Sequence, residues 1–271
     1  MTSFPRFALA FLLLAATPAF AQFQPQVGQA GKDVIWVPTP EEVVERMLTM
    51  AQVTANDFVV DLGSGDGRTV IAAAKKFGAK AMGVEYNPDM VKLSEANAQK
   101  AGVAERASFR RADIFQTDFS QATVITLYLL PSLNMKLRPQ ILSMKPGTRV
   151  ASHSVTMEDW EADEISTMDG RRAYFWIVPA QVQGGWTLDT GAQKVDVNFE
   201  QQFQKISGSV NFGAVQGGLR EARLRGPQIA FSYVDQAGVR RDFTGTVDGK
   251  QMQGTFRDQK GAEGQWSAAR K

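Results

Sequence analysis

Residues 59–67, Val-Val-Asp-Leu-Gly-Ser-Gly-Asp-Gly, decide how this chain is expected to fold. An apolar run turns into an acid and then into three glycines at every second position. This pattern predicts a buried parallel strand that passes through a tight loop into a helix. The glycines let the backbone approach a ligand closely, and the helix offers its N-terminal amides to a polar or negative group.

The spacing of these glycines argues against two other nucleotide-binding loops. The dinucleotide fingerprint requires Gly-x-Gly-x-x-Gly, whereas this loop reads Gly63-x-Gly65-x-Gly67. A P-loop ends in Gly-Lys-Ser/Thr, whereas residues 66–69 read Asp-Gly-Arg-Thr. An acidic loop repels a pyrophosphate but suits a ligand that carries an ammonium and a sulfonium. Another nucleotide-type fold stays open as the weaker alternative.

Strand and helix patterns alternate from residue 36 to residue 157. Strands are expected at 57–62, 80–85, 107–112, 122–130 and 148–155, with helices after the glycine loop, after Asn87-Pro88 and over 132–144. Before the first strand, Thr39 is expected to cap a helix with Glu42 as its capping-box partner. Pro139 is expected to kink or divide its helix. The alternation predicts an α/β domain over 36–178, with a Rossmann-like sheet and helices on both faces.

The character of the chain changes after about residue 180. Helical periodicity disappears, and short alternating strands with glycine punctuation predict an antiparallel β meander or small barrel over 180–271. Glycines recur after apolar residues, as at Gly208, Gly245 and Gly254. We interpret them as bulges or tight bends of a curled sheet rather than as a binding feature.

The first 21 residues have the pattern of a signal peptide. Arg6 precedes an apolar stretch at 7–16, and Ala19-Phe20-Ala21 forms an A-x-A cleavage site. The sequence therefore predicts an exported, periplasmic chain that begins at Gln22. An uncleaved segment that anchors the chain to the membrane is the alternative, although the apolar run is short for a bilayer span.

Composition excludes several kinds of chemistry. The chain has no cysteine and a single histidine, His153, so disulfides, thiolate nucleophiles and multi-histidine metal sites are excluded. The net charge of +2 provides no general case for binding nucleic acid. No metal is expected.

Further motifs carry a resemblance to a known family. Pro38-Thr39-Pro40-Glu-Glu, Gly83-Val-Glu85, Asp113-Ile-Phe115 and the block 124–131, Val-Ile-Thr-Leu-Tyr-Leu-Leu-Pro, accompany the glycine loop and lead to Ser152-His153. The loop resembles motif I of class I S-adenosylmethionine (SAM)-dependent methyltransferases. The whole stretch resembles the lysine methyltransferases that include the mitochondrial ATP synthase c-subunit enzymes and their bacterial relatives. It covers roughly half of the chain.

The resemblance implies SAM as cofactor and a set of residues that hold it. The implied cofactor-binding residues are Thr39, Asp61, Gly63, Ser64, Gly65, Gly67, Glu85, Tyr86, Asp113, Ile114 and Phe115. Among them Glu85 would take the ribose hydroxyls, and Asp113 the adenine amino group. Tyr128, Leu130 and Pro131 would lie beside the acceptor nitrogen and are the candidate catalytic residues. A lone histidine at the end of a buried strand, such as His153, is more often structural than catalytic.

The function that follows is methyl transfer from SAM to a protein lysine. Such a transfer is an in-line displacement in which the protein mainly binds and aligns, so no catalytic side chain is strictly required. A protein that presents a lysine is the expected partner. Two alternatives stay open. The first is an exported methyltransferase-like binding or scaffold protein without activity, which fits an export signal because SAM is made in the cytosol. The second is a small-molecule or lipid methyltransferase whose β-domain closes over the site.

Overall fold

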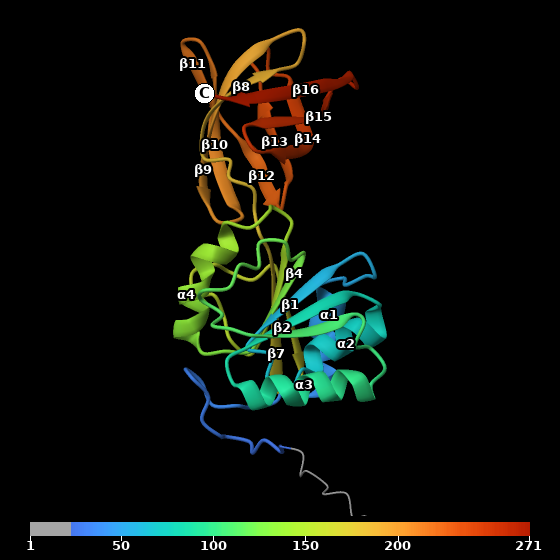
Figure 1. Ribbon diagram of the computed structural model, residues 1–271. Helices are drawn as coiled ribbons and strands as arrows, with labels where there is room; N and C mark the ends of the chain where they lie inside the picture. The colour runs from blue at the N-terminus through green and yellow to red at the C-terminus, as the bar shows by residue number, and fades with distance from the viewer. Residues whose placement is uncertain (1–22) are drawn as a thin grey trace, which may run out of the picture.

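A computed structural model describes residues 23–271 (Figure 1). The predicted signal peptide, residues 1–21, lies outside the described residues. Across residues 23–271, no helix has the length and apolarity needed to cross a membrane. Two sheets organise the chain, one ending at β7 and the other beginning at β8.

The first sheet has seven strands in the order β3-β2-β1-β4-β5-β7-β6. Their bounds are β1 Phe58–Leu62, β2 Lys80–Glu85, β3 Ala107–Arg111, β4 Val124–Leu127, β5 Arg149–His153, β6 Glu164–Met168 and β7 Arg171–Ile177. Strands β1 to β5 are parallel, whereas β7 runs antiparallel between β5 and β6. The carboxyl ends of the five parallel strands therefore meet at one edge, where ligands of open α/β sheets bind.

Helices cover both faces of this sheet, as predicted. Helices α1 (Glu41–Met50), α2 (Arg68–Phe77) and α3 (Pro88–Lys100) contribute to the core on one face, and α4 (Pro131–Leu142) packs on the other. Successive side chains of a strand point to opposite faces of the sheet, so Val59 of β1 belongs to the core under α1 to α3 and Val60 to the core under α4.

Several local predictions were wrong. Helix α1 begins at Glu41 with Pro40 at the N-cap position and no side-chain capping bond, so Thr39 is one residue too early to cap it. The Thr39 hydroxyl instead lies 3.2 Å from Nδ1 of His153. Helix α4 continues through Pro139, which deprives the helix of one backbone hydrogen-bond donor without ending it. Strands β4 and β5 are shorter than the expected 122–130 and 148–155.

The second sheet is antiparallel and almost closed, which confirms the predicted small barrel. Its order is β11-β10-β9-β8-β16-β15-β14-β13-β12. The bounds are β8 Gly184–Asp189, β9 Lys194–Gln202, β10 Lys205–Phe212, β11 Val215–Gly218, β12 Arg220–Arg225, β13 Gln228–Val234, β14 Arg240–Asp248, β15 Gln251–Asp258 and β16 Glu263–Arg270. Strand β10 also contacts β12, so the two margins of the sheet approach each other.

Aromatic side chains fill the barrel. Phe231 and Phe243 stack at 5.0 Å between ring centroids, and the Trp266 ring meets both edge-on. Gly245 and Gly254 face each other across β14 and β15. A Cβ on Gly254 would lie 1.9 Å from the Thr244 carbonyl oxygen, so this close backbone approach requires glycine.

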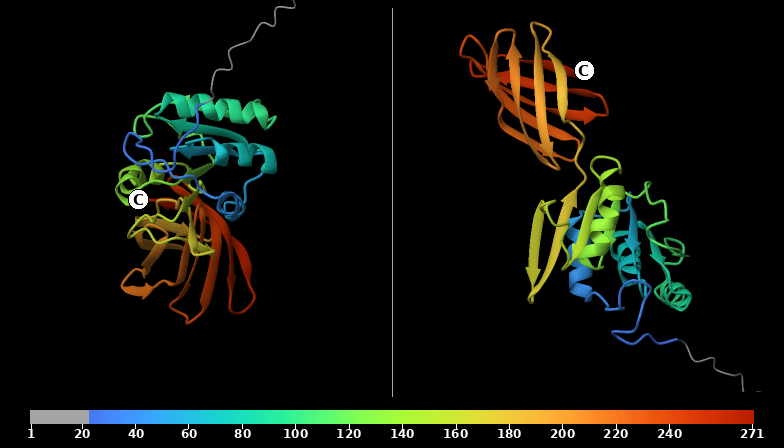
Figure 2. Two further views of the ribbon diagram at one scale, coloured as in Figure 1. Left: turned by 90° about the horizontal axis from the view of Figure 1, so that it is seen from below. Right: turned by 90° about the vertical axis from the view of Figure 1, so that its left-hand side faces the viewer.

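The barrel lies at the end of the first sheet that is remote from the N-terminal segment 26–37 (Figures 1 and 2). Phe203, between β9 and β10, stacks on Trp160 of the first domain with ring centroids 6.0 Å apart. Lys205 pairs with Glu161 at 2.6 Å. Trp186 does not lie at this contact, because it is buried in the barrel core. The barrel therefore leaves the carboxyl edge of the first sheet uncovered.

Candidate functional site

The glycine loop between β1 and α2 has a backbone that only glycine adopts readily. Gly63, Gly65 and Gly67 have φ values of +83°, +55° and +82°. A Cβ on Gly65 would lie 2.7 Å from Nε1 of Trp36, so the N-terminal segment packs directly on the loop. Gly67 lines neither neighbouring cavity; it is the N-cap of α2, and a Cβ there would lie 2.7 Å from the Phe109 ring. Its predicted cofactor contact stays a prediction.

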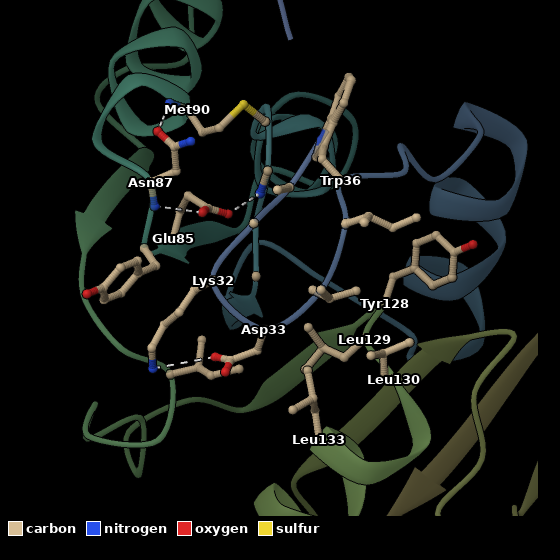
Figure 3. A pocket seen from close by; sticks show the side chains of 18 of the residues that line it. Lys32, Asp33, Trp36, Glu85, Asn87, Met90, Tyr128, Leu129, Leu130 and Leu133 are labelled. Carbon is tan, nitrogen blue, oxygen red and sulfur yellow. Dashed lines mark hydrogen bonds and ion pairs between the residues drawn. The ribbon is translucent and has the colours of Figure 1, made fainter. Parts of the chain in front are cut away.

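A cavity of about 270 Å³ opens at the carboxyl edge of the sheet (Figure 3). Its walls are residues 29–37, the glycine loop, and the ends of β2, β3 and β4. We call residues 29–37 the strap. The strap is ordered by backbone bonds, since Trp36 N donates to the Gln29 carbonyl at 2.9 Å and Gly28 N donates to the Trp36 carbonyl at 2.9 Å. The cavity has the size of a small-molecule site.

Glu85, at the end of β2, points into this cavity (Figure 3). One carboxylate oxygen accepts a bond of 3.0 Å from Gly65 N, and the other accepts one of 2.9 Å from Asn87 N. These backbone donors fix the carboxylate while leaving further lone pairs for ligand hydroxyls. The geometry suits the predicted ribose contact, which stays a prediction.

Asp113 follows β3 and lines the larger cavity. One of its oxygens accepts a bond of 2.9 Å from Phe115 N, and the other lies 2.6 Å from Nζ of Lys32. The hydrogen bond from Lys32 holds the pKa of Asp113 below its usual range. Lys32 also lies 5.1 Å from the ring centroid of Tyr86. Asp113 and Tyr86, two of the implied cofactor-binding residues, are thus both contacted by a lysine of the strap.

Ile114 and Phe115, the implied cofactor-binding residues that follow Asp113, differ in position. Ile114 lines the cavity, but Phe115 does not. The Phe115 ring instead lies under Nζ of Lys136, 3.7 Å from its centroid. Only its backbone amide contributes to the site, by orienting Asp113.

A second, smaller cavity of about 40 Å³ lies on the other side of the glycine loop. Thr39, Asp61, Ser64 and Arg68 line it. The two cavities share Trp36, Val37, Gly63, Gly65 and Tyr128 as lining residues, so they meet at these side chains. A ligand that fills both must therefore pass Tyr128 at its middle.

Asp61 is a buried acid in the smaller cavity. It accepts a bond of 2.6 Å from the Thr126 hydroxyl, and burial raises its pKa to about 7. A buried carboxyl of this kind takes up charge readily when a cation is placed beside it. Arg68 lines the same cavity and is held by Asp66 at 2.6 Å. The small cavity thus combines an acid with a base, as an amino-acid moiety requires.

Tyr128 follows β4 and lies against His153 at the end of β5. Their ring centroids are 4.0 Å apart at 38°. Burial lowers the pKa of His153 to about 4, so its imidazole is neutral near pH 7. Of the other candidate catalytic residues, Leu130 lines the larger cavity with 42% of its surface exposed, whereas Pro131 begins α4 outside both cavities.

Sequence reasoning missed the strap. No site residue was predicted before Thr39, yet Lys32, Ile35 and Trp36 line the larger cavity. Trp36 was the available signal, since tryptophan side chains are highly buried on average. Within residues 23–271, no group of three or more metal-binding side chains is assembled.

Comparison with known proteins finds relatives of the α/β part of the chain. A family model described as the ANTKMT methyltransferase domain matches residues 61–164. A protein-lysine N-methyltransferase of Saccharolobus islandicus is 47% identical over 134 residues, which are 49% of this chain and 83% of that protein. The lysine N-methyltransferase of the ATP synthase c-subunit from Mus musculus is 31% identical over 160 residues, which are 59% of each chain.

A solved structure adds a bound ligand to the comparison. It is described as an RNA methyltransferase from Salinibacter ruber in complex with S-adenosyl-L-homocysteine. It matches with a TM-score of 0.53 and 49% identity, over 54% of this chain and 96% of that one. The family model ends at residue 164, so the barrel that begins at β8 lies outside it.

Proposed function

The chain belongs to the family of the protein-lysine N-methyltransferases, and from this premise we propose that it transfers a methyl group from SAM to a lysine side chain of a protein. The family resemblance, the α/β fold with its β-rich extension and SAM as cofactor are all confirmed. The lysine acceptor and the roles of individual residues are our proposal.

The observation that carries this function is the pair of cavities that meet at Tyr128. Glu85 and Asp113 suit the adenosine part in the larger cavity, while Asp61 suits the ammonium of the methionine part in the smaller one. The sulfonium joins these two parts of SAM, so it belongs at the junction beside Tyr128. When bound, SAM supplies the activated methyl group for an in-line displacement.

The rim of the larger cavity suits an amine that must lose its proton. Ile35, Val37 and Leu130 are exposed there by 55%, 38% and 42%. Apolar surroundings disfavour the charged form of a lysine and so lower its pKa toward the neutral nucleophile. The barrel lies at the end of the first sheet that is remote from this cavity, which leaves room for a whole protein. This position argues against the alternative in which the β-domain closes over the site.

Calorimetric titration with SAM and S-adenosyl-L-homocysteine tests the cofactor site. Residues 22–271 should bind both ligands, and Glu85→Ala should weaken binding by about 1–3 kcal/mol, the scale of lost hydrogen bonds to a charged group. Glu95→Ala, which removes an exposed acid from α3, is the matched control and should leave binding unchanged. Unchanged affinity in Glu85→Ala would refute the ribose assignment.

Transfer of a labelled methyl group identifies the acceptor. The protein is incubated with methyl-labelled SAM and, separately, with total protein and total RNA. Methyllysine in hydrolysed protein supports the proposal. Label in RNA would instead identify RNA as the acceptor, the class named in the description of the Salinibacter ruber protein. Firm cofactor binding without label in either fraction would favour the inactive scaffold.

We also propose that residues 1–21 direct export and are removed. Arg6, the apolar stretch 7–16 and the small-residue site Ala19-Phe20-Ala21 support this proposal. Cell fractionation followed by N-terminal sequencing tests it: a periplasmic chain that begins at Gln22 supports export, and a cytosolic chain that begins at Met1 contradicts it.

A further inference from the structure

Two buried polar side chains near Tyr128, Thr39 and His153, take no part in the proposed methyl transfer itself. Thr39 is 7% exposed and does not cap α1, although it stands next to its N-terminus. His153 is 3% exposed and is neutral near pH 7, so it holds no proton ready for transfer. Burying polar groups costs free energy unless they are paired. Their hydrogen bond, with 3.2 Å between Oγ1 and Nδ1, is that pairing.

The hydrogen bond joins three parts of the site. Thr39 lies just after the strap, and its carbonyl oxygen accepts a bond of 3.0 Å from Arg68 at the start of α2. His153 ends β5, and a turn follows in which Val155 N donates to the His153 carbonyl at 2.7 Å. The pair therefore connects the strap, the glycine-loop helix and the edge of the sheet.

The same pair supports Tyr128. The His153 ring packs on the Tyr128 ring at 4.0 Å between centroids, and Tyr128 lines both cavities at their junction. Any rotation of the imidazole would move the surface on which the tyrosine ring rests. Because the Thr39 hydroxyl fixes the imidazole, it positions the Tyr128 ring indirectly, through His153.

We propose that Thr39 and His153 are positioning residues that hold Tyr128 beside the methyl group and so set the geometry of its transfer. This inference rests on the proposed function. A loss of this alignment affects the reacting centre more than it affects cofactor binding, because the adenosine part is held elsewhere, by Glu85 and Asp113. An acid or base role for His153 is not part of the proposal.

Two cofactor analogues read out this geometry without a known acceptor. S-adenosyl-L-homocysteine leaves the methyl position empty. Sinefungin replaces the methylsulfonium with a carbon that bears an amine, and so places a polar group where the methyl and acceptor nitrogen meet. The ratio of the two affinities, measured by calorimetry on residues 22–271, therefore reports the surroundings of Tyr128. A merely structural defect would weaken both ligands together.

The variants remove the hydrogen bond from either side. Thr39→Val deletes the hydroxyl at nearly constant shape, and His153→Phe keeps a ring against Tyr128 without a partner for Thr39. Each should change the affinity ratio by about fivefold, the scale of one lost hydrogen bond. Thr39→Ser should restore the parent ratio, and the double variant should be no worse than either single one, since both remove the same contact. Thr49→Val, at an exposed position of α1, is the control.

The outcomes separate this inference from the function beneath it. Changed ratios with rescue by Thr39→Ser support the positioning pair. An unchanged ratio in both variants, a parallel loss of both ligands, or additive effects in the double variant would overturn it while leaving cofactor binding established. Failure of the parent chain to bind S-adenosyl-L-homocysteine would overturn the proposed function and this inference with it.

Discussion

The affinity for SAM should fall as the pH is lowered from 7.0 to 5.5, and Asp61 should be the cause. Burial raises the pKa of this carboxyl to about 7, so the empty site is half protonated at pH 7 and almost fully protonated at pH 5.5. The ligand ammonium needs the charged carboxylate, whereas an α-amino group stays protonated over this range. Binding at low pH must therefore first remove a proton from Asp61.

The size of the effect follows from the pKa. The fraction of charged Asp61 falls about 16-fold between pH 7.0 and pH 5.5, which corresponds to about 1.6 kcal/mol of binding free energy. Binding at pH 6 should also release about 0.9 proton, because that share of the carboxyl is protonated in the empty protein. Calorimetry in two buffers of different ionisation enthalpy measures both quantities.

Asp61→Asn is the matched variant for this experiment. Its amide oxygen can still accept the hydrogen bond from Thr126, while the titrating charge is gone. Its affinity should be low and should not vary over the same pH range. The reasoning is refuted if the parent chain binds equally well at pH 5.5 and pH 7.0, or if Asp61→Asn keeps the pH dependence of the parent.

Three further changes test other parts of the structure. Gly65→Ala should abolish cofactor binding, because its Cβ would meet Trp36 at 2.7 Å. The control is Gly102→Ala, which has φ of +72° and open space around it and should lower stability alone. Calorimetry measures the loss of binding, and thermal melting measures the loss of stability. Lys32→Ala should tighten binding of adenosine a few-fold by freeing the oxygen of Asp113, and weaker binding would show that the strap lysine helps the ligand instead. Phe203→Ala should destabilise the chain by about 1–3 kcal/mol in denaturant unfolding and leave cofactor affinity alone; a loss of affinity would contradict the remote position of the barrel.

The α/β half could be predicted because its sequence signals are local. The run from Val59 to Gly67 contains the strand, the loop and the helix start in consecutive residues, and Asn87-Pro88 contains both the cap and the first residue of α3. The curled sheet was predictable for the same reason, from short strands and glycines that recur at close approaches of the backbone.

What sequence reasoning missed depends on contacts between distant segments. Lys32 pairs with Asp113 across 81 positions, and Thr39 pairs with His153 across 114. No periodicity or short motif encodes such pairs. The capping prediction for Thr39 failed because Pro40 occupies the N-cap position, and the Thr39 hydroxyl pairs instead with His153, far along the chain.

The strap has a practical consequence for handling the protein. Any tag joined to Gln22 would begin a few residues from the cofactor cavity and, if it displaced Trp36, would depress the measured affinity without a change in the enzyme itself. The other terminus is safer, because it leaves the molecule from the barrel, where Lys271 N donates to the Gly185 carbonyl at 3.0 Å (Figure 1). Purification handles, fluorophores and surface attachment therefore belong at the C-terminus.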